Sequence, residues 1–188
     1  DDTDAEWTLT LYAYCNEKPE LLNEEHIVAE EQFVLQPYSF PTAHHEGNIE
    51  VERGENWIAA YVGHTGALFH TGNGRLMRYV SEGRDLMKEL PEPWFWRAMT
   101  DNDWGEGLQS TANVWRTNRR KALGATVEEF DDRVVVKGEY YLVDAPSYYT
   151  TIYTFRADGS LQVEVEWRRD GEYVPELPRF GMRMSFAA

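Results

Sequence analysis

The residues best suited to chemistry lie in the string FWRAMTDNDWGEG, residues 95–107, where two aspartates flank an asparagine between aromatic and glycine residues. Oxygen ligands at alternate positions are typical of calcium-binding loops. Asp101 and Asp103 fit positions 1 and 3 of an EF-hand loop, but Glu106 occupies the position that requires glycine, and Ala112 occupies the position that requires glutamate. The spacing therefore argues against a calcium loop.

A pair of carboxylates also suggests glycosidase chemistry, in which one carboxylic acid donates a proton and a second carboxylate acts as nucleophile or base. On an extended chain Asp101 and Asp103 would point the same way, about 6–7 Å apart, whereas retaining enzymes hold their two carboxyl groups about 5–5.5 Å apart. In a turn the spacing does not fix this separation. The alternative is that these Asp and Asn side chains accept hydrogen bonds from loop amides, and the residues alone leave both interpretations open.

The overall charge restricts the partners of the protein. The 188 residues include 18 Lys and Arg against 33 Asp and Glu, a net charge of −15, which would repel a nucleic-acid backbone or an anionic membrane. We therefore expect no nucleic-acid partner and no membrane partner, but a neutral substrate or another protein. Cys15 is the single cysteine, so no intrachain disulfide forms, and the compartment, cytoplasmic or periplasmic, is left open.

Other catalytic and metal-binding motifs are missing from the sequence. It contains no P-loop, no G-x-S-x-G elbow, no G-x-G-x-x-G and no cysteine cluster. His44, His45 and Glu46 could contact a metal, but no second ligand cluster accompanies them, and we interpret them as part of a solvated linker. We therefore expect no metal ligand set in this chain.

The elements that position these residues are predicted to be almost entirely β-strands. Alternating apolar residues predict strands at 7–14 and 26–36, although good helix formers make a helix over 20–32 the competing interpretation of the second. Hairpin turns are predicted at 54–56, 72–74, 131–132 and 157–160, and a last strand at 179–186. This spacing indicates an all-β fold, a large antiparallel β-sandwich.

Two stretches interrupt the strand pattern. Pro37, Pro41 and a polar end predict a linker at 38–47, which separates a first domain at 1–37 from a second at 48–188. Residues 91–120 show no clean period and are rich in Trp, Arg, Asp, Asn and Gly. A loop of this length within a compact domain is uncommon and usually functional, so we predict a functional loop here.

The predicted loop resembles a known family. FWRAMTDNDWGEG is similar to the Arg-Ala-Pro-x-Asp-Asn-Asp-x-Gly signature in the C-terminal small-chain domain of family 2 β-galactosidases, with Met99 at the usual proline position. The matching residues are Arg97, Ala98, Asp101, Asn102, Asp103 and Gly105. Weaker collinear similarity extends over nearly the whole chain. WTLTLYAY and EHIVAEEQFVL resemble the last strands of the preceding immunoglobulin-like domain, and the hairpins up to LPRFGMRM resemble the first part of the small-chain domain.

The resemblance implies a fold and a function. It implies that 1–37 is the end of an immunoglobulin-like β-sandwich and that 48–188 is the N-terminal part of a supersandwich related to galactose mutarotase. The parent enzymes hydrolyse terminal β-D-galactosides such as lactose with retention, through two glutamates on a TIM barrel outside this chain. The chain alone is therefore expected to be an inactive fragment that binds no cofactor, and Mg²⁺ and Na⁺ are expected on the barrel side of a homo-oligomeric bacterial parent.

The resemblance also implies roles for single residues. Gly105 corresponds to a hinge, and the segment that follows it corresponds to a mobile loop over the active site. The expected loop and hinge residues are Asp101, Asn102, Asp103, Gly105, Glu106 and Gly107. Candidate sugar or interface contacts are Arg97, Trp104 and Trp115. The alternative hypothesis is a stand-alone carbohydrate-binding β-sandwich module whose tryptophans stack on sugar.

Overall fold

The computed structural model describes residues 5–17, 20–22, 25–39, 47–117, 119–171 and 173–187. The chain divides into two units, Asp1–Ala43 and His44–Ala188. The predicted linker at 38–47 falls mostly outside the described residues, and the His44–Glu46 triplet lies entirely outside them. No helix among the described residues is long and apolar enough to cross a membrane.

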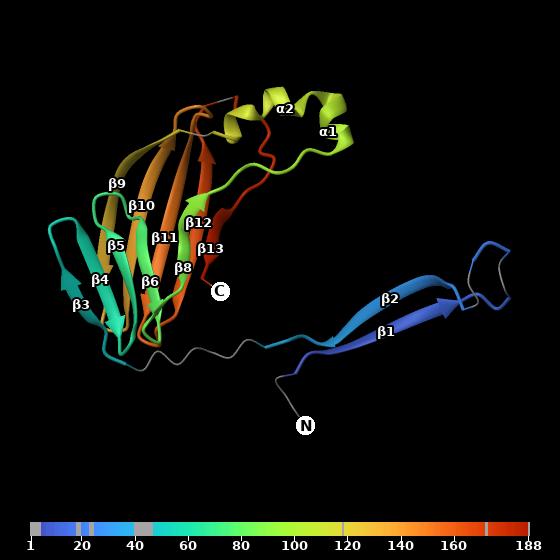
Figure 1. Ribbon diagram of the computed structural model, residues 1–188, viewed down its shortest axis with the longest axis horizontal. Coiled ribbons are helices and arrows are strands. Elements are labelled where there is room, and N and C mark those ends of the chain that lie inside the picture. Colours follow the sequence, from blue (N-terminus) through green and yellow to red (C-terminus); the bar gives the residue numbers. More distant parts are fainter. Residues whose placement is uncertain are drawn as a thin grey trace. The chain divides into compact units, whose positions relative to one another are not determined.

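The described part of the first unit is a hairpin of two antiparallel strands, β1 (Trp7–Tyr14) and β2 (Ile27–Gln36) (Figure 1). The strand interpretation of 26–36 is therefore confirmed. Leu9 lies opposite Phe33, and both side chains remain more than two-fifths exposed. A two-stranded ribbon buries little of its own apolar surface, which accounts for this exposure within the unit.

The second unit is an antiparallel β-sandwich, which confirms the predicted fold class (Figure 1). Its described residues form a five-stranded sheet in the order β3-β4-β5-β6-β7, a four-stranded sheet in the order β12-β11-β10-β9, and a β8–β13 pair. The strands of the first sheet are β3 (Glu50–Arg53), β4 (Trp57–Val62), β5 (Thr65–His70), β6 (Leu76–Ser81) and β7 (Arg84–Asp85). The remaining strands are β8 (Met87–Pro93), β9 (Arg120–Glu129), β10 (Arg133–Leu142), β11 (Ser147–Arg156), β12 (Leu161–Arg169) and β13 (Met182–Phe186).

Glycine shapes two of the hairpin turns that the sequence predicts. Gly74, between β5 and β6, has φ 70°, and an added Cβ there would lie 2.6 Å from the Cα of Gly138 on β10. Gly159, between β11 and β12, has φ 80°, and the Asp158 carboxylate beside it accepts a 2.9 Å hydrogen bond from the Ser160 amide. Because side chains other than glycine rarely adopt these conformations, both positions specify the turn.

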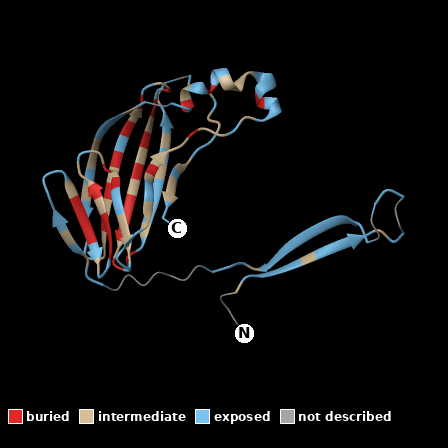
Figure 2. Ribbon diagram, viewed as in Figure 1, coloured by how far each residue is buried: buried red, intermediate tan, exposed pale blue. Residues whose placement is uncertain are grey.

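The main core lies between the two large sheets. Ile58 and Phe69 from the first sheet pack in one cluster with Val136 and Phe155 from the second. Burial alternates along β10, where every second residue is buried, as Figure 2 shows for the central strands. This is the period of two that the sequence displays, since successive side chains of a strand point to opposite faces.

A second core cluster lies where the chain between β8 and β9 packs against one end of the four-stranded sheet. This part of the chain contains α1 (Asp101–Glu106), α2 (Leu108–Thr111) and the 3₁₀ turn η1 (Asn113–Trp115), which together we name the helical segment (Figure 1). The prediction of an irregular loop over 91–120 is corrected here, because β8 continues to Pro93 and three short helical elements follow. Helices of three to six residues are too short to show a 3.6-residue period.

Candidate active-site segment

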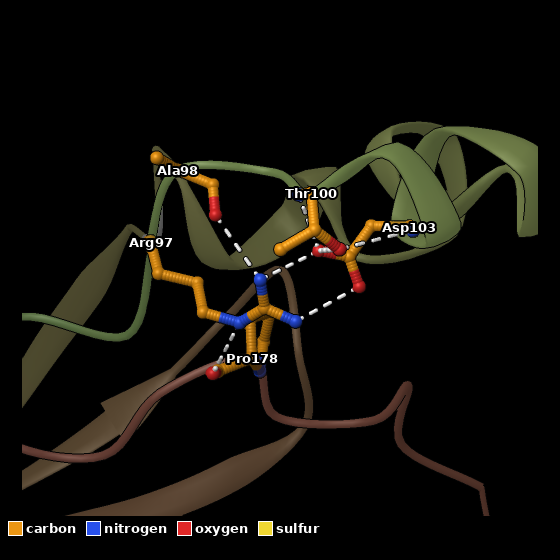
Figure 3. A network of polar contacts seen from close by, with 5 residues as sticks. All are labelled: Arg97, Ala98, Thr100, Asp103 and Pro178. Atoms are coloured by element: carbon orange, nitrogen blue, oxygen red, sulfur yellow. Dashed lines mark hydrogen bonds and ion pairs between the residues drawn. The ribbon is translucent and has the colours of Figure 1, made fainter. Parts of the chain in front are cut away.

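The helical segment begins at a side-chain cap made by Thr100 and Asp103 (Figure 3). The Thr100 hydroxyl accepts a hydrogen bond from the Asp103 amide at 3.4 Å, and the Asp103 carboxylate accepts one from the Thr100 amide at 2.8 Å. This reciprocal pair satisfies two amides that a helix start leaves free, as in a capping box. The local sequence Thr-Asp-Asn-Asp therefore starts a helix.

Arg97 holds this cap in place from outside the helix. Its guanidinium donates to both oxygens of Asp103, at 2.5 and 2.8 Å, and its Nε donates to the Pro178 carbonyl at 3.2 Å (Figure 3). A fourth hydrogen bond joins Arg97 to the Ala98 carbonyl at 3.1 Å. Bidentate pairs of this kind fix orientation as well as charge. Arg97 therefore joins the start of α1 to a stretch of backbone about eighty residues later in the chain.

The surroundings of Asp103 determine what its carboxyl group can do. The hydrogen bonds from Arg97, followed by the one from the Thr100 amide, hold the pKa of Asp103 well below its usual range. The side chain is 12% exposed, and both of its oxygens are engaged. Asp103 is ionised at neutral pH and acts as an anchor, since a general acid must hold a proton. Of the two sequence interpretations, the geometry at Asp103 favours binding of loop amides.

A second anchor lies at the end of the helical segment, at Trp115. Its ring packs edge-on against Phe95 at 5.5 Å and Trp167 at 6.0 Å between ring centroids, and its Nε1 donates to the Pro175 carbonyl at 3.3 Å. Trp115 is 2% exposed. Trp115 therefore serves mainly in packing within this unit, and its contact with sugar or a partner stays a prediction.

The middle of the helical segment is exposed. Asp101, Asn102, Trp104, Gly105 and Glu106 all face solvent, and Trp104 is 59% exposed. The structure thus brings Arg97 and Asp103 together, whereas the side chains of Asp101, Asn102 and Glu106 form no hydrogen bond or ion pair with another described residue. Trp104 remains a candidate contact with sugar, since its indole is an accessible aromatic surface.

The two glycines of the segment differ in conformation. Gly105 lies inside α1, where an added Cβ would meet nothing within 4 Å. Gly107 ends α1 in the left-handed region, with φ 74° and ψ 21°, and its amide donates to the Asp103 and Trp104 carbonyls. The position in this segment that demands glycine is therefore Gly107, which separates α1 from α2.

Sequence reasoning missed Thr100 and the two proline carbonyls. Thr100 had a signal, because Thr followed three residues later by Asp is close to the capping-box pattern Ser/Thr-x-x-Glu. Pro175 and Pro178 had none, because their carbonyl groups act through a tertiary contact. Within the described residues, no group of three or more His, Cys, Asp or Glu side chains is placed to hold a metal ion.

The helical segment lies within a part of the chain that matches a known family. Residues 63–188 match the family described as β-galactosidase small chain. The chain is 28% identical over 189 residues to a β-galactosidase of Priestia megaterium, covering 97% of this chain and 18% of that protein. It is 29% identical over 147 residues to a β-galactosidase of Halalkalibacterium halodurans, covering 76% of this chain and 14% of that protein.

A relative that is named as a subunit is also similar. The chain is 26% identical over 144 residues to the β-galactosidase small subunit of Latilactobacillus sakei, covering 61% of this chain and 42% of that protein. In each of these comparisons the chain spans less than half of the relative. Because the family match extends over more than half of its residues, the chain belongs to the β-galactosidase small chain family.

Proposed function

We propose that this chain is part of a retaining β-galactosidase, in which it serves as an accessory domain whose helical segment helps to form the active site. The observation that carries the proposal is the arrangement of that segment within a unit of the β-galactosidase small chain family. Its two ends are anchored through Arg97 and Trp115, and α1 between them exposes all its residues except Asp103. A segment held at both ends with a free middle can cover a bound sugar and exclude water.

The reacting carboxylates of the proposed enzyme lie outside this chain, on two glutamates of a barrel domain. The environment of Asp103 supports the proposal that the reacting groups lie elsewhere, because Arg97 and Thr100 engage both of its oxygens and keep the carboxylate ionised. The proposed substrates are terminal β-D-galactosides such as lactose. In this arrangement the helical segment supplies position and shape, which contribute to rate without proton transfer.

The subunit named in Latilactobacillus sakei supports the proposal that a small chain works with a larger catalytic part. We place the Mg²⁺ and Na⁺ sites of such an enzyme in that part, because the described residues of this chain offer no cluster of three ligands of the His, Cys, Asp or Glu type. A homo-oligomeric enzyme is part of the same proposal.

The first test is a kinetic one on the complete β-galactosidase. Gly105→Ala places a methyl group in open space within α1 and should stabilise the helical state by about 0.5–1 kcal/mol. If opening of the segment is part of turnover, kcat and KM change together while the melting temperature moves little. Gly181→Ala is the matched control, because Gly181 also has open space at Cβ and lies outside the segment. Unchanged kcat and KM for Gly105→Ala would contradict the proposal that the helical segment acts as a lid, that is, that it opens and closes over the active site.

The second test uses this chain alone with a chromogenic β-galactoside. We expect no hydrolysis above a buffer blank at any pH, because the proposed nucleophile and acid are absent from the chain. The affinity of the chain for galactose and lactose is measured as well, because a stand-alone binding module would bind sugar without hydrolysing it. Turnover by the chain would refute the placement of the glutamates, and tight sugar binding without turnover would favour the module.

A further inference from the structure

One carboxylate in the second unit is shared by two guanidinium groups. Glu92, on β8, forms ion pairs with Arg75, at the end of the β5–β6 turn, and with Arg120, at the start of β9. The three residues belong to or adjoin three different sheets, and all are half-buried. Two positive charges against one negative charge leave this junction with a local excess of positive charge.

The described surroundings do not neutralise that excess. Neither Arg75 nor Arg120 forms an ion pair with any described residue other than Glu92. The Arg120 guanidinium lies 5.8 Å from the ring centroid of Tyr140, whose hydroxyl is already used in a 2.5 Å bond to the Asn73 carbonyl. Burial lowers the pKa of Arg120 and the charge of Arg75 lowers it further, as expected where positive charge is poorly solvated and crowded.

A cavity of about 250 Å³ opens beside this junction, at the start of β9. Its polar lining includes Arg116 and Thr117, and Arg116 is exposed and forms no ion pair with a described residue. The complete lining is Glu92, Pro93, Trp94, Phe95, Trp115, Arg116, Thr117 and Arg120. Two arginines, one threonine and aromatic residues therefore line one small space together with the Glu92 carboxylate, which is paired with Arg120.

Tyr149, which carries a buried hydroxyl, packs in the core cluster that contains two lining residues of this cavity, Phe95 and Trp115. The Tyr149 ring packs edge-on against Phe95 at 5.6 Å, and its hydroxyl is buried without a hydrogen-bond partner among the described residues. Unsatisfied buried polar groups are rare in native proteins and commonly bind an ordered water or ion. The position of Tyr149, next to Phe95 and within the field of Arg120, places such a group beside the excess charge.

We propose that this cavity binds a small oxyanion, a carboxylate or a phosphate, held by Arg116, Arg120 and the Thr117 hydroxyl. The planar fork of a guanidinium matches the two oxygens of such an anion, which favours an oxyanion over chloride. The cavity is smaller than the roughly 300–1,000 Å³ that accommodates drug-sized ligands, so the site suits a small anion. The two arginines of the cavity contrast with the net charge of −15 on the chain, and the site does not depend on the proposed lid.

Anion titration with the whole protein tests the site. Inorganic phosphate and acetate are added separately at constant ionic strength, balanced with chloride, and tryptophan fluorescence is followed, because Trp94 and Trp115 line the cavity. We expect a saturable change with at least one of the two anions, and the anion that saturates identifies the class. Arg116→Gln should weaken that binding about tenfold or more, the loss expected for a charged hydrogen bond.

Arg119→Gln is the matched control for the titration. Arg119 is a neighbouring exposed arginine that does not line the cavity and is paired with Asp144 at 2.6 Å. Its substitution should leave the affinity unchanged. A linear response to both anions, or an equal loss in Arg116→Gln and Arg119→Gln, would overturn the proposal. Both substitutions are at exposed positions, so the comparison does not depend on tolerance of the core to change.

Glu92→Gln provides a second test, because this substitution should raise the affinity for the oxyanion, whereas Arg116→Gln should lower it. It leaves Arg75 and Arg120 without their carboxylate, so the variant should melt at a lower temperature in chloride and bind the oxyanion more tightly than the unchanged protein. The oxyanion should then restore more of the lost melting temperature than it adds to the unchanged protein. Phosphate also stabilises proteins nonspecifically, so an equal rise in Glu92→Gln, Arg116→Gln and the unchanged protein would count against the site.

Discussion

Arg97 precedes the helical segment and Trp115 ends it, yet both donate to one short stretch of backbone. Arg97 Nε reaches the Pro178 carbonyl at 3.2 Å, and Trp115 Nε1 reaches the Pro175 carbonyl at 3.3 Å. The segment is therefore a loop with both ends on the same support. Its ends are fixed relative to each other while most of α1 faces solvent, which is the geometry that a cover over a neighbouring site requires.

The first prediction concerns pH and the anchor at Asp103. Hydrogen bonding by Arg97 lowers the folded-state pKa of Asp103, so its contribution to stability is complete above the unfolded pKa of about 3.9 and declines as pH falls below it. Asp103→Asn should therefore melt at a lower temperature than the unchanged protein at pH 7, and the difference should shrink below about pH 4. Thermal melts at several pH values measure this.

Asp101→Asn is the control for that series. The Asp101 side chain is exposed and has no hydrogen bond or ion pair with a described residue, so its substitution should change the melting temperature little. A difference between Asp103→Asn and the unchanged protein that stays constant down to pH 3 would contradict the electrostatic account of this anchor.

The second prediction concerns the packing of Trp115. Trp115→Ala should cost about 3–5 kcal/mol of unfolding free energy, the range for large-to-small changes of buried aromatic residues. Trp115→Phe keeps a ring against Phe95 and Trp167 but removes the donor to Pro175, so it should cost less. Urea unfolding followed by far-UV circular dichroism measures both. Equal costs for the two variants would mean that the hydrogen bond, and not the packing, dominates this anchor.

The strands of this protein could be predicted because their physical causes are local. Alternation in β10 and the Asp158–Gly159 turn identify elements whose burial and φ angles the structure then shows. The strand β8 was not predicted, and neither were the short strand β7 and the helical segment. Their few residues carry no period, and their stability comes from contacts with distant parts of the chain.

In the candidate site too, features with local causes could be predicted, and features that depend on distant contacts could not. The Asp101–Asp103 triplet and the glycines after it can be recognised as a sequence pattern. The burial of Trp115, by contrast, depends on its contacts with Trp167 and Phe95. No feature of the neighbouring sequence distinguishes Trp115 from the exposed Trp104. Which glycine ends α1 depends on where the helix begins. Thr100 sets that beginning, and α1 then ends at Gly107, after Gly105 has been included in the helix.

The third prediction tests whether Gly107 is the joint between α1 and α2. Gly107 has φ 74° and open space at Cβ, so a substitution there meets backbone strain but no clash. Gly107→Ala should cost about 1–2 kcal/mol, the penalty of the left-handed conformation for a side chain with a Cβ. Gly107→Asn should cost less, because asparagine tolerates that conformation better than alanine.

Both Gly107 variants are compared by thermal melting and, in the complete β-galactosidase, by steady-state kinetics. If the joint controls how the helical segment closes, Gly107→Ala changes kcat and KM more than Gly107→Asn, in the same order as their effects on stability. Gly83→Ala is a control for strain alone, because Gly83 has the same φ of 74° with open space at Cβ and lies in the β6–β7 turn. Kinetic changes of equal size in Gly83→Ala and Gly107→Ala would mean that general destabilisation causes the effect. They would contradict the proposal that Gly107 controls closure of the helical segment.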